Sequence, residues 1–354
     1  MKLNDAFKRI SKNELLRESV IDLCRKVEDY LEYEGDIREE ITGPILDEMY
    51  CSNSIIRKQL QNGLIFDFFY RTKIARDFIL SKPKLPDHVW EPQTTKLLIH
   101  LSKKANNVII GGAYFGDQTI ILCKELSSKG GICHAFEPNS DQFERLNHNA
   151  KINELNNLRS WNQPLWCDSN SQLNLVGEDS YAFVQKVSFD KKNSEPAQGL
   201  QTISIDDYIL REGIGMVDLI MLDIEGAEEN VLRGASNLLK QHPSVPTIVF
   251  EVHKNYVNWD NGLENSDIVC FLKSCGYGHI YAIRDYNSNV NMGESPIELI
   301  PCDRVYLEGP PHGFNMIAVK DQSIVMEENF RICYDVSPKL LKHKDPKIHS
   351  PLYL

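Results

Sequence analysis

Apolar residues in the first 82 positions recur mainly at the spacing of amphipathic helices. The clearest series consists of Leu16, Val20, Leu23, Val27 and Leu31. These positions lie three or four residues apart and share one helix face, and Ser11 and Glu14 before them have the spacing of a capping box. Similar patterns predict helices over 45–60 and 64–80, and the proline-rich segment 83–92 is predicted to be a linker.

The pattern changes after this linker, because short β-rich runs alternate with longer stretches of helical spacing. Strands are predicted over 107–110, 131–136, 217–223 and 246–253. The helices predicted after them span 118–126, 140–153, 228–241 and 266–275. Such alternation is typical of a parallel sheet with helices on both faces. We therefore expect a helical N-terminal region over 1–95, an α/β domain over 96–330 and a C-terminal extension over 331–354.

Composition and charge narrow the function classes. The chain has 354 residues, 42% hydrophobic and 25% charged, which is ordinary for a soluble globular protein. Its 39 basic and 50 acidic residues give a net charge of -11, which argues against nucleic-acid binding through global charge. The nine cysteines include no C-x-x-C pair, so we expect reduced thiols and a cytoplasmic location. No apolar segment approaches the ~20 residues of a membrane span.

A glycine-rich turn joins the first strand of the α/β region to its helix. The turn contains Gly111, Gly112, Ala113, Tyr114, Phe115 and Gly116, and the helix opens with Gln118 and Thr119. Glycine lets the backbone approach a ligand closely, and amides at a helix start face an anionic group. Because Ala113 replaces the middle glycine of the dinucleotide fingerprint, the turn alone fits either a nucleotide site or a simple tight turn.

The second strand ends at an acidic residue, Glu137, which is followed by Pro138. A carboxylate at this place can accept hydrogen bonds from both ribose hydroxyls of a nucleoside. The glycine turn and Glu137 would lie at the carboxyl ends of adjacent strands, where open α/β sheets bind ligands. Together they favour an adenosine-containing ligand, which is either a nicotinamide cofactor or S-adenosylmethionine.

Three carboxylates cluster at the end of the strand predicted over 217–223, namely Asp223, Glu225 and Glu228. Carboxylates at the end of a buried strand are costly unless they have partners or a task. Asp223 is therefore a functional candidate. Glu228 and Glu229 also fit a simpler explanation, since acidic residues in the first turn of a helix are favoured by the helix dipole.

Taken in order, these motifs resemble the FkbM family of S-adenosylmethionine-dependent methyltransferases. The shared positions are Gly112, Ala113, Gly116 and Thr119; Phe136, Glu137 and Pro138; Asn149 and Asn153; Asp223, Glu225, Gly226, Ala227, Glu228, Val231, Leu232, Gly234 and Ala235; and Glu251 and His253. The resemblance covers about residues 105–255, and Asn315 fits a terminal strand of the same domain. It implies a doubly wound, mostly parallel Rossmann-like class I methyltransferase sheet with an N-terminal helical appendage.

Two positions depart from the family pattern. The family usually has an acid two residues before the Gly-Ala pair, where this chain has Ile110, and that acid commonly holds the cofactor's amino group. The family also commonly has a lysine two residues before the motif aspartate, where this chain has Met221. The contact made by the acid must be replaced or lost, and the two changes leave altered chemistry or an inactive domain open.

The resemblance implies methyl transfer from S-adenosylmethionine to a hydroxyl of a sugar or natural-product small molecule. A hydroxyl acceptor must lose a proton, and His253 is the best candidate base because imidazole titrates near neutral pH. Glu251, which would orient His253, and Asp223 complete the candidate catalytic set. The same three residues alternatively bind a divalent cation, and His253 alternatively has only a structural role.

We expect the cofactor to be contacted by three regions. The methionyl end is assigned to the turn amides and helix start, that is to Gly111, Gly112, Ala113, Tyr114, Phe115, Gly116, Gln118 and Thr119, with Asp223 nearby. Glu137, with Pro138 beside it, is assigned to the ribose. Gln163, Pro164 and Leu165, after the third strand, are assigned to the adenine, and Trp166 is either a cofactor wall or a core residue.

The acceptor site is expected near the polar and aromatic segments 256–261 and 287–295, whose hydrogen-bonding side chains suit sugar hydroxyls. Both segments are alternatively surface loops, and His312 either faces the same pocket or is solvated. The N-terminal helices cap this pocket, form a homodimer or recognise a carrier.

Two other functions remain open on the sequence alone. A nicotinamide-dependent oxidoreductase would use the same fold, although Ala113 and the acidic block after Asp223 argue against it. A degenerate methyltransferase-fold protein used for interaction would be consistent with Ile110 and Met221.

Overall fold

The computed structural model describes residues 3–34, 36–72, 74–81, 83–177, 183–186, 199–240, 245–285, 292–293, 296–307 and 313–338. Nine strands among them form the central sheet. In spatial order they are β14 (Phe330–Ile332), β12 (Ile297–Pro301), β11 (His279–Ile283), β13 (Gly313–Val319), β10 (Thr247–His253), β9 (Leu219–Leu222), β3 (Asn107–Gly111), β4 (Ile132–Phe136) and β5 (Leu158–Trp161).

Most neighbouring strands of this sheet are parallel. The run from β10 through β9, β3 and β4 to β5 is parallel throughout, whereas β13 is antiparallel to both β10 and β11. β12 is antiparallel to β11 and parallel to β14. The predicted doubly wound, mostly parallel sheet is thus confirmed. The chain order reverses between β3 and β9, and open α/β sheets bind ligands at such a switch point.

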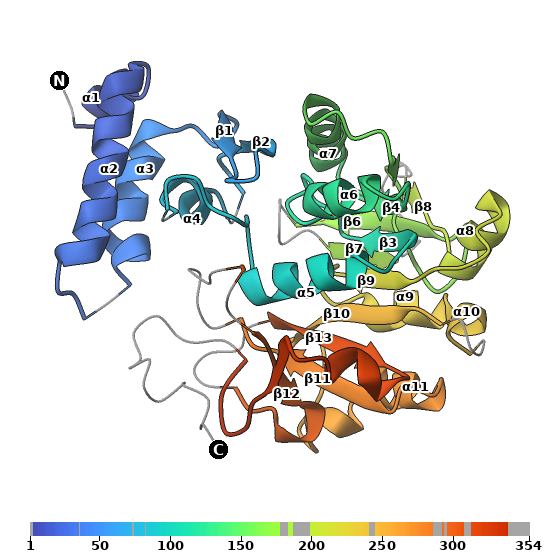
Figure 1. Ribbon diagram of the computed structural model, residues 1–354. Helices are drawn as coiled ribbons and strands as arrows, with labels where there is room; N and C mark the ends of the chain where they lie inside the picture. The colour runs from blue at the N-terminus through green and yellow to red at the C-terminus, as the bar shows by residue number, and fades with distance from the viewer. Residues whose placement is uncertain are drawn as a thin grey trace, which may run out of the picture.

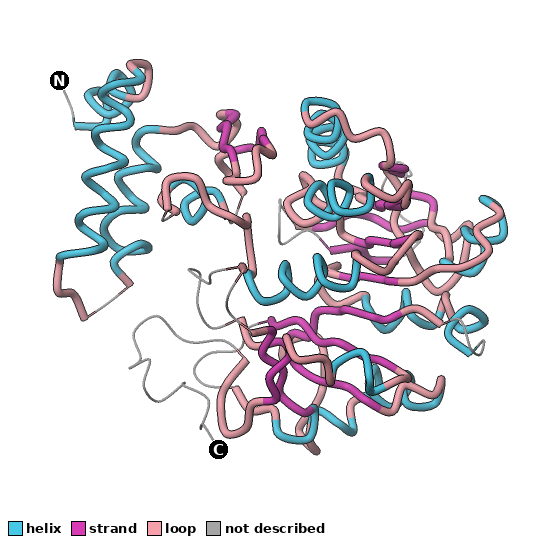
Figure 2. The backbone as a smooth tube through the Cα atoms, viewed as in Figure 1, coloured by secondary structure: helices cyan, strands magenta, loops and turns pink. Residues whose placement is uncertain are grey.

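Helices cover both faces of the sheet, which explains why its strands are apolar on both sides (Figures 1 and 2). Ile110 and Met221 share one apolar cluster with α5 (Pro92–Ser102), α6 (Thr119–Ser127) and α7 (Ser140–Ile152). Ile109 and Ile220 share the other with α8 (Ile205–Glu212), α9 (Glu228–Arg233), α10 (Ser236–Lys240) and α11 (Asp267–Ser274). Within the described residues, every helix is too short or too polar to serve as a membrane span.

Short elements complete this part of the chain. A separate three-stranded sheet contains β7 (Phe183–Lys186), β6 (Gln172–Val176) and β8 (Leu200–Gln201) in that order. The 3-10 helices are η3 (Leu263–Asn265), η4 (Cys302–Arg304) and η5 (Gln322–Val325). The helix predicted over 228–241 is instead two helices that meet near Gly234. A Cβ atom on Gly234 would lie 2.2 Å from the carbonyl oxygen of Trp166, so glycine lets the chain pass this loop.

The N-terminal region combines helices with a β-hairpin. Its helices are α1 (Leu3–Ile10), α2 (Glu14–Tyr30), the π-helix η1 (Arg38–Thr42), α3 (Gly43–Met49) and α4 (Ala75–Ile79). The hairpin consists of β1 (Ile55–Gln59) and β2 (Ile65–Phe69), so the helices predicted over 45–60 and 64–80 are wrong there. The physical reason is the Asn62-Gly63 turn, in which Gly63 has a φ of +89°. Asn13, and not Ser11, caps α2 by accepting a hydrogen bond from the amide of Leu16 at 3.1 Å.

Two asparagines of α7 hold this hairpin against the α/β domain. Asn149 Oδ1 accepts a hydrogen bond from the amide of Asp67 at 2.8 Å, and Asn149 Nδ2 donates to the Asp67 carbonyl at 3.0 Å. Asn153 makes the equivalent pair with Ile65, at 2.8 and 2.6 Å. Each amide side chain therefore pairs with β2 as a neighbouring strand would. The asparagines noted in the sequence join the N-terminal hairpin to the α/β domain.

Candidate functional site

The glycine turn follows β3 at the point where the strand order reverses. Gly112 and Gly116 have φ values of +78° and +95°, in the left-handed region that favours glycine. A Cβ atom on Gly112 would lie 1.8 Å from the carbonyl oxygen of Asp223, so only glycine allows so close an approach. The turn is therefore in direct contact with the acidic segment that follows β9.

Several amides of this turn are used within the protein. The amides of Gly112 and Ala113 donate to the Phe136 carbonyl at 3.0 and 3.1 Å, and the amide of Gly116 donates to the Ala113 carbonyl at 2.9 Å. The amides of Gly112, Ala113 and Gly116 are therefore used within the protein, whereas the expected contacts of the rest of the turn and of Thr119 with a ligand stay predictions. Ala113 and Phe115 are also buried, so their side chains shape the turn from the core.

Glu137 lies at the carboxyl end of β4 and ties the turn to α7. Its Oε2 accepts a hydrogen bond from the amide of Tyr114 at 2.7 Å, and its Oε1 accepts from the amide of Asn139 at 2.8 Å. Glu137 is buried, and Pro138 separates it from the start of α7. Both carboxylate oxygens of Glu137 are thus held in place at the carboxyl end of β4, beside the glycine turn.

The loop after β5 also reaches the turn. A Cβ atom on Gly111 would lie 3.1 Å from Leu165 Cδ1, which places Leu165 against the end of β3. The Pro164 carbonyl accepts from the amide of Ile203 at 3.2 Å, which fixes the loop, and Gln163 is half-buried beside it. Trp166 is 7% exposed and packs with Leu173 and Ala227, so it is a core residue.

Three carboxylates meet at the ends of β9 and β10. Asp223, Glu225 and Glu251 each offer an oxygen within 4.8 Å of the others, and all three are half-buried. Burial raises the pKa of Asp223 well above its ordinary value, and the charges of Glu251, Glu91, Glu225 and Asp117 raise it further. Such a concentration of negative charge suits a positively charged ligand. Within the described residues, these three carboxylates are the group whose oxygens are close enough together to hold a metal ion. The expected metal ligands were Asp223, Glu251 and His253, so Glu225 takes the place of His253 in this group.

Glu228 fixes the main chain that presents these carboxylates. It is 3% exposed, and its Oε1 accepts from the amide of Ile224 at 2.9 Å while its Oε2 accepts from the amide of Gly226 at 3.1 Å. Burial raises the pKa of Glu228 to about 8. Glu229 instead pairs with Arg233 on the same helix at 2.7 Å. Glu228 is thus a turn anchor, and Glu229 fits the simpler role of a helix charge.

His253 is half-buried at the end of β10, on the same face as Glu251. Its Nδ1 accepts a hydrogen bond from the amide of Asn255 at 3.0 Å. A neutral imidazole with an accepting Nδ1 carries its proton on Nε2. In this arrangement the lone pair of Nδ1 is used within the protein, which disfavours the expected role of His253 as general base.

Two acidic residues of the site were missed from the sequence. Asp117 directly follows the glycine turn, and burial together with the charge of Glu91 raises the pKa of Asp117 to about 7. Glu91 lies before α5, is buried, and accepts a hydrogen bond from Asn315 Nδ2. The position of Asp117 next to Gly116 was a usable signal. Glu91 had none, because it lies in the segment predicted to be a linker.

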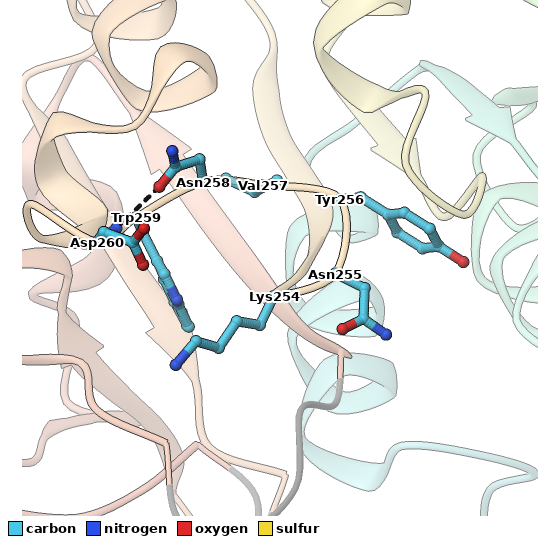
Figure 3. Close-up of a pocket in the computed structure, with 7 residues that line it drawn as sticks. All are labelled: Lys254, Asn255, Tyr256, Val257, Asn258, Trp259 and Asp260. Atoms are coloured by element: carbon cyan, nitrogen blue, oxygen red, sulfur yellow. Dashed lines mark hydrogen bonds between the residues drawn. The ribbon is translucent and has the colours of Figure 1, made fainter.

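A pocket of about 260 Å³ follows the end of β10 and is lined by Lys254, Asn255, Tyr256, Val257, Asn258, Trp259 and Asp260 (Figure 3). The segment expected at 256–261 thus forms most of its wall. Trp259 stacks on Phe314, with ring centroids 5.6 Å apart. Tyr256 lies over Gly226, where a Cβ atom would be 2.7 Å from its ring, and so borders the acidic turn. Most of 287–295, and His312, lie outside the described residues.

Comparison with known proteins identifies the central part of the chain. Residues 111–278 match the family model described as the methyltransferase FkbM domain. This match confirms the resemblance inferred from the motifs. No curated protein is significantly similar to the chain in sequence.

Solved structures similar to the chain are distant. The methyltransferase FkbM of Methylobacillus flagellatus shares 14% identity over 61% of this chain and 44% of its own, with a TM-score of 0.36. The O-methyltransferase TomG of Streptomyces achromogenes, involved in tomaymycin synthesis and solved with SAM, shares 12% identity over 71% and 87%, with a TM-score of 0.34. An O-methyltransferase of Bacillus cereus solved with SAH shares 14% identity over 86% and 99%, with a TM-score of 0.33.

Proposed function

Because residues 111–278 match the family model of the methyltransferase FkbM domain, we propose that the protein transfers a methyl group from S-adenosylmethionine to a hydroxyl of a small molecule, either a sugar or a natural product. A nicotinamide-dependent oxidoreductase is the alternative on the same type of sheet. The two proposals differ in the charge that the bound ligand presents to the glycine turn. A dinucleotide brings a pyrophosphate, whereas S-adenosylmethionine brings a sulfonium and an ammonium group.

The observation that carries the proposal is the polarity of the site around this turn. A pyrophosphate is held by free amides of the glycine turn and the helix start, and in this turn the amides of Gly112, Ala113 and Gly116 are bonded to main-chain carbonyls. Carboxylates surround the same turn, and burial together with the charges of neighbouring carboxylates, Glu91 among them, raises the pKa of Asp117 and of Asp223. A cationic ligand relieves this repulsion, whereas a dinucleotide would increase it.

The cofactor assignment follows the strand ends. Glu137 is fixed at the carboxyl end of β4, where its carboxylate would accept from the ribose hydroxyls. The loop of Gln163, Pro164 and Leu165 borders the end of β3, where the adenine would lie. The methionyl end would lie between the glycine turn and Asp117. When bound, S-adenosylmethionine supplies a methyl group on a positively charged sulfur.

The catalytic assignment changes from the one expected on sequence. A base for a hydroxyl needs a pKa near the working pH, and Asp223 has a raised pKa because of its burial and acidic neighbours. We assign it as the general base: it takes the hydroxyl proton as the oxygen–methyl bond forms and the sulfur–methyl bond breaks, with S-adenosylhomocysteine as the neutral leaving product. His253, at the end of the same strand as Glu251, would orient the acceptor. Glu251 would hold that arrangement from the same face of β10.

A divalent cation is the alternative partner of these carboxylates. Asp223, Glu225 and Glu251 are hard oxygen ligands of the type that Mg²⁺ accepts. A metal at this place would lower the pKa of a bound hydroxyl. Activity that is abolished by EDTA and restored by Mg²⁺ would support this version, and equal turnover with and without EDTA would support Asp223 acting alone.

The acceptor is assigned to the pocket around Trp259. Lys254, Asn258 and Asp260 line it with charged and amide groups, and Trp259 adds an aromatic surface. This mixture suits a polyhydroxylated ring, whose faces are apolar and whose edges carry hydroxyls. Tyr256 of the pocket wall contacts Gly226 in the acidic turn, and this contact supports placing the acceptor on the Asp223 side of the sheet.

The N-terminal helices supply a candidate dimer surface. Leu16, Leu23 and Tyr30 follow each other at intervals of seven residues on α2 and are 52%, 57% and 84% exposed. Such a stripe is self-complementary in a two-fold pairing of α2 with a second copy. A dimer mass by light scattering that Leu23→Glu converts to a monomer mass would support this pairing, and a monomeric wild type would refute it.

Six buried free cysteines support a reducing compartment such as the cytoplasm.

Calorimetry tests the cofactor directly. Saturable binding of S-adenosylmethionine without binding of NAD supports the proposal, and the reverse pattern supports an oxidoreductase. Glu137→Gln should weaken binding by about 1.5–3 kcal/mol, the range for hydrogen bonds to a charged group. Glu144→Gln is the matched control, because Glu144 is exposed on α7. Binding of neither cofactor would favour a degenerate domain used for interaction.

A methyltransferase assay tests the reaction. Pooled sugars, nucleotide sugars and glycosylated metabolites should be offered with and without Mg²⁺, and methylated product should form in at least one pool. Asp223→Asn should abolish turnover while retaining cofactor binding. Turnover close to wild type in this variant would remove Asp223 from the catalytic role.

A further inference from the structure

The two departures from the family pattern lie side by side. Ile110 of β3 and Met221 of β9 are direct partners in the parallel register of the sheet. Both side chains are 2% exposed. The family's usual acid and lysine would therefore be neighbours, and this chain replaces both with apolar residues. The sheet itself then offers no acid beside the glycine turn at these positions.

Glu91 brings a carboxylate to the same face of the sheet from outside it. Val249 and Ile317 pack in one apolar cluster with Ile110 and Met221. Because alternate residues of a strand share a face, Glu251 of β10 and Asn315 of β13 also lie on this face, opposite each other in the register. Asn315 Nδ2 donates to Glu91 Oε2. The carboxylate of Glu91 is thus held over the carboxyl ends of the strands.

The main chain at Glu91 is fixed in an uncommon conformation. Its φ is +44°, in the left-handed region that a non-glycine residue adopts only when its surroundings impose it. The surroundings here are firm, because Asp285 accepts from the amides of Gln93 and Thr94 at 2.6 and 3.0 Å. The Thr95 amide donates to the Glu91 carbonyl at 2.8 Å. The start of α5 is therefore anchored so that Glu91 turns towards the site.

Asn315 indicates that a hydrogen-bond donor belongs beside Glu91. Asn315 is 2% exposed, and within the described residues its Oδ1 has no hydrogen-bond partner. Oδ1 and Nδ2 share one carbon, so Oδ1 lies beside the Glu91 carboxylate to which Nδ2 is bonded. A buried acceptor next to a carboxylate calls for a donor with more than one N–H. An ammonium group has three.

We infer that Glu91, together with Asn315 Oδ1, binds the α-ammonium group of S-adenosylmethionine and so replaces the strand acid that is absent at Ile110. This inference rests on the proposed function. Asp117, at the end of the glycine turn, lies close enough to Glu91 for each charge to act on the other, and it completes the acidic surroundings of the ammonium group. Glu91 is a binding residue in this assignment and takes no part in the proton transfer.

The contact between Glu91 and the ammonium group is tested by removing each partner separately. Calorimetry compares S-adenosylhomocysteine with S-(5′-deoxyadenosyl)-4-mercaptobutanoate, which lacks only the amino group, in the wild type and in Glu91→Gln. We expect the wild type to prefer S-adenosylhomocysteine by about 10- to 100-fold and Glu91→Gln to reduce that preference about tenfold. Glu327→Gln is the control, since Glu327 pairs with Lys104 at the surface, and its preference should equal that of the wild type.

Three results would overturn the assignment of Glu91. Glu91→Gln could bind both ligands as the wild type does, or it could lose affinity equally for both, which leaves the preference unchanged and would indicate a general structural effect. Alternatively, Mg²⁺ could tighten S-adenosylhomocysteine binding in the wild type but not in Glu91→Gln, which would assign Glu91 to a metal. If the wild type binds neither ligand, the proposed function fails and this inference with it, so the two failures are distinguishable.

Discussion

Asn149 is completely buried in α7 and joins three parts of the molecule. Besides its two bonds with Asp67 of β2, its Nδ2 donates to the Phe115 carbonyl of the glycine turn at 2.9 Å. Phe115 also stacks on Phe68 of the hairpin, with ring centroids 5.5 Å apart. We predict that Asn149→Ala lowers the free energy of unfolding by about 3 kcal/mol and weakens cofactor binding.

The expected loss of about 3 kcal/mol follows from the main-chain groups that lose their hydrogen-bond partner in Asn149→Ala. Alanine leaves three main-chain groups without their partner, the amide and carbonyl of Asp67 and the carbonyl of Phe115. A buried polar group that loses its partner costs about 1–3 kcal/mol. We take about 1 kcal/mol for each, at the low end of that range, because β2 is paired to β1 on its other side and water can reach the freed edge when the hairpin lifts.

Urea denaturation followed by circular dichroism measures this loss, with Glu144→Ala as the control on the exposed side of the same helix. Cofactor affinity should fall as well, because the Phe115 carbonyl helps to fix the turn. An unfolding free energy within about 0.5 kcal/mol of the wild type, the usual range for surface substitutions, would refute the reasoning. Loss of stability with unchanged affinity would refute only the link to the turn.

Three further changes have defined expected outcomes. Gly112→Ala should prevent stable folding or cofactor binding, because its Cβ would lie 1.8 Å from the Asp223 carbonyl oxygen. The control is Gly63→Ala, at a φ of +89° with no atom within 4 Å, which should lower the free energy of thermal unfolding by only about 1–2 kcal/mol. His253→Gln should lower turnover less than about tenfold and leave the pH profile unchanged, whereas loss of the pH-dependent limb would make His253 the base. Because the pKa of Asp117 is about 7, a cationic ligand that lowers it should release protons near pH 7, which calorimetry in buffers of different ionisation enthalpy detects.

The strands β3, β4, β9 and β10 and the helical segments that follow them were predictable because their signals are local. β3 at Asn107–Gly111 and β4 at Ile132–Phe136 are short apolar runs buried on both faces, and α7 at Ser140–Ile152 begins after the capping residue Asn139. Glycine turns and acidic residues at the strand ends were equally visible. Parallel strands place those ends together, so Asp223 and the glycine turn could be expected to meet.

The remaining features depend on contacts between distant parts of the chain. Glu91 reaches its partner Asn315 across 224 positions, and no local pattern marks it. The amides of Gly112 and Ala113 are hydrogen-bonded because the Phe136 carbonyl of β4 accepts from both of them, and this contact joins different parts of the chain. The hairpin of β1 and β2 was mistaken for helix because its apolar residues also fit helical spacing, and the Asn62-Gly63 turn was the local signal that should have decided it.

The charge of the acidic cluster connects cofactor binding to catalysis in the proposed reaction. In the free protein, burial and the neighbouring carboxylates hold the pKa of Asp223 well above its ordinary value, so its proton is retained to higher pH. A positive charge bound among these groups lowers that pKa, so Asp223 becomes a base only when the methyl donor is in place. Methyl transfer removes the positive charge as Asp223 gains its proton, and the raised pKa then favours the protonated product state.

This coupling predicts that cofactor binding lowers the pKa of Asp223, and pH measurements can test that direction. The pKa that limits turnover at saturating S-adenosylmethionine should lie below the pKa of Asp223 in the cofactor-free protein. The first value comes from the pH profile of kcat, and the second from carboxyl carbon NMR, assigned by comparison with Asp223→Asn. An equal or higher pKa in the turnover profile would mean that the cofactor's charge does not reach Asp223, and a base elsewhere in the site would then have to take the hydroxyl proton.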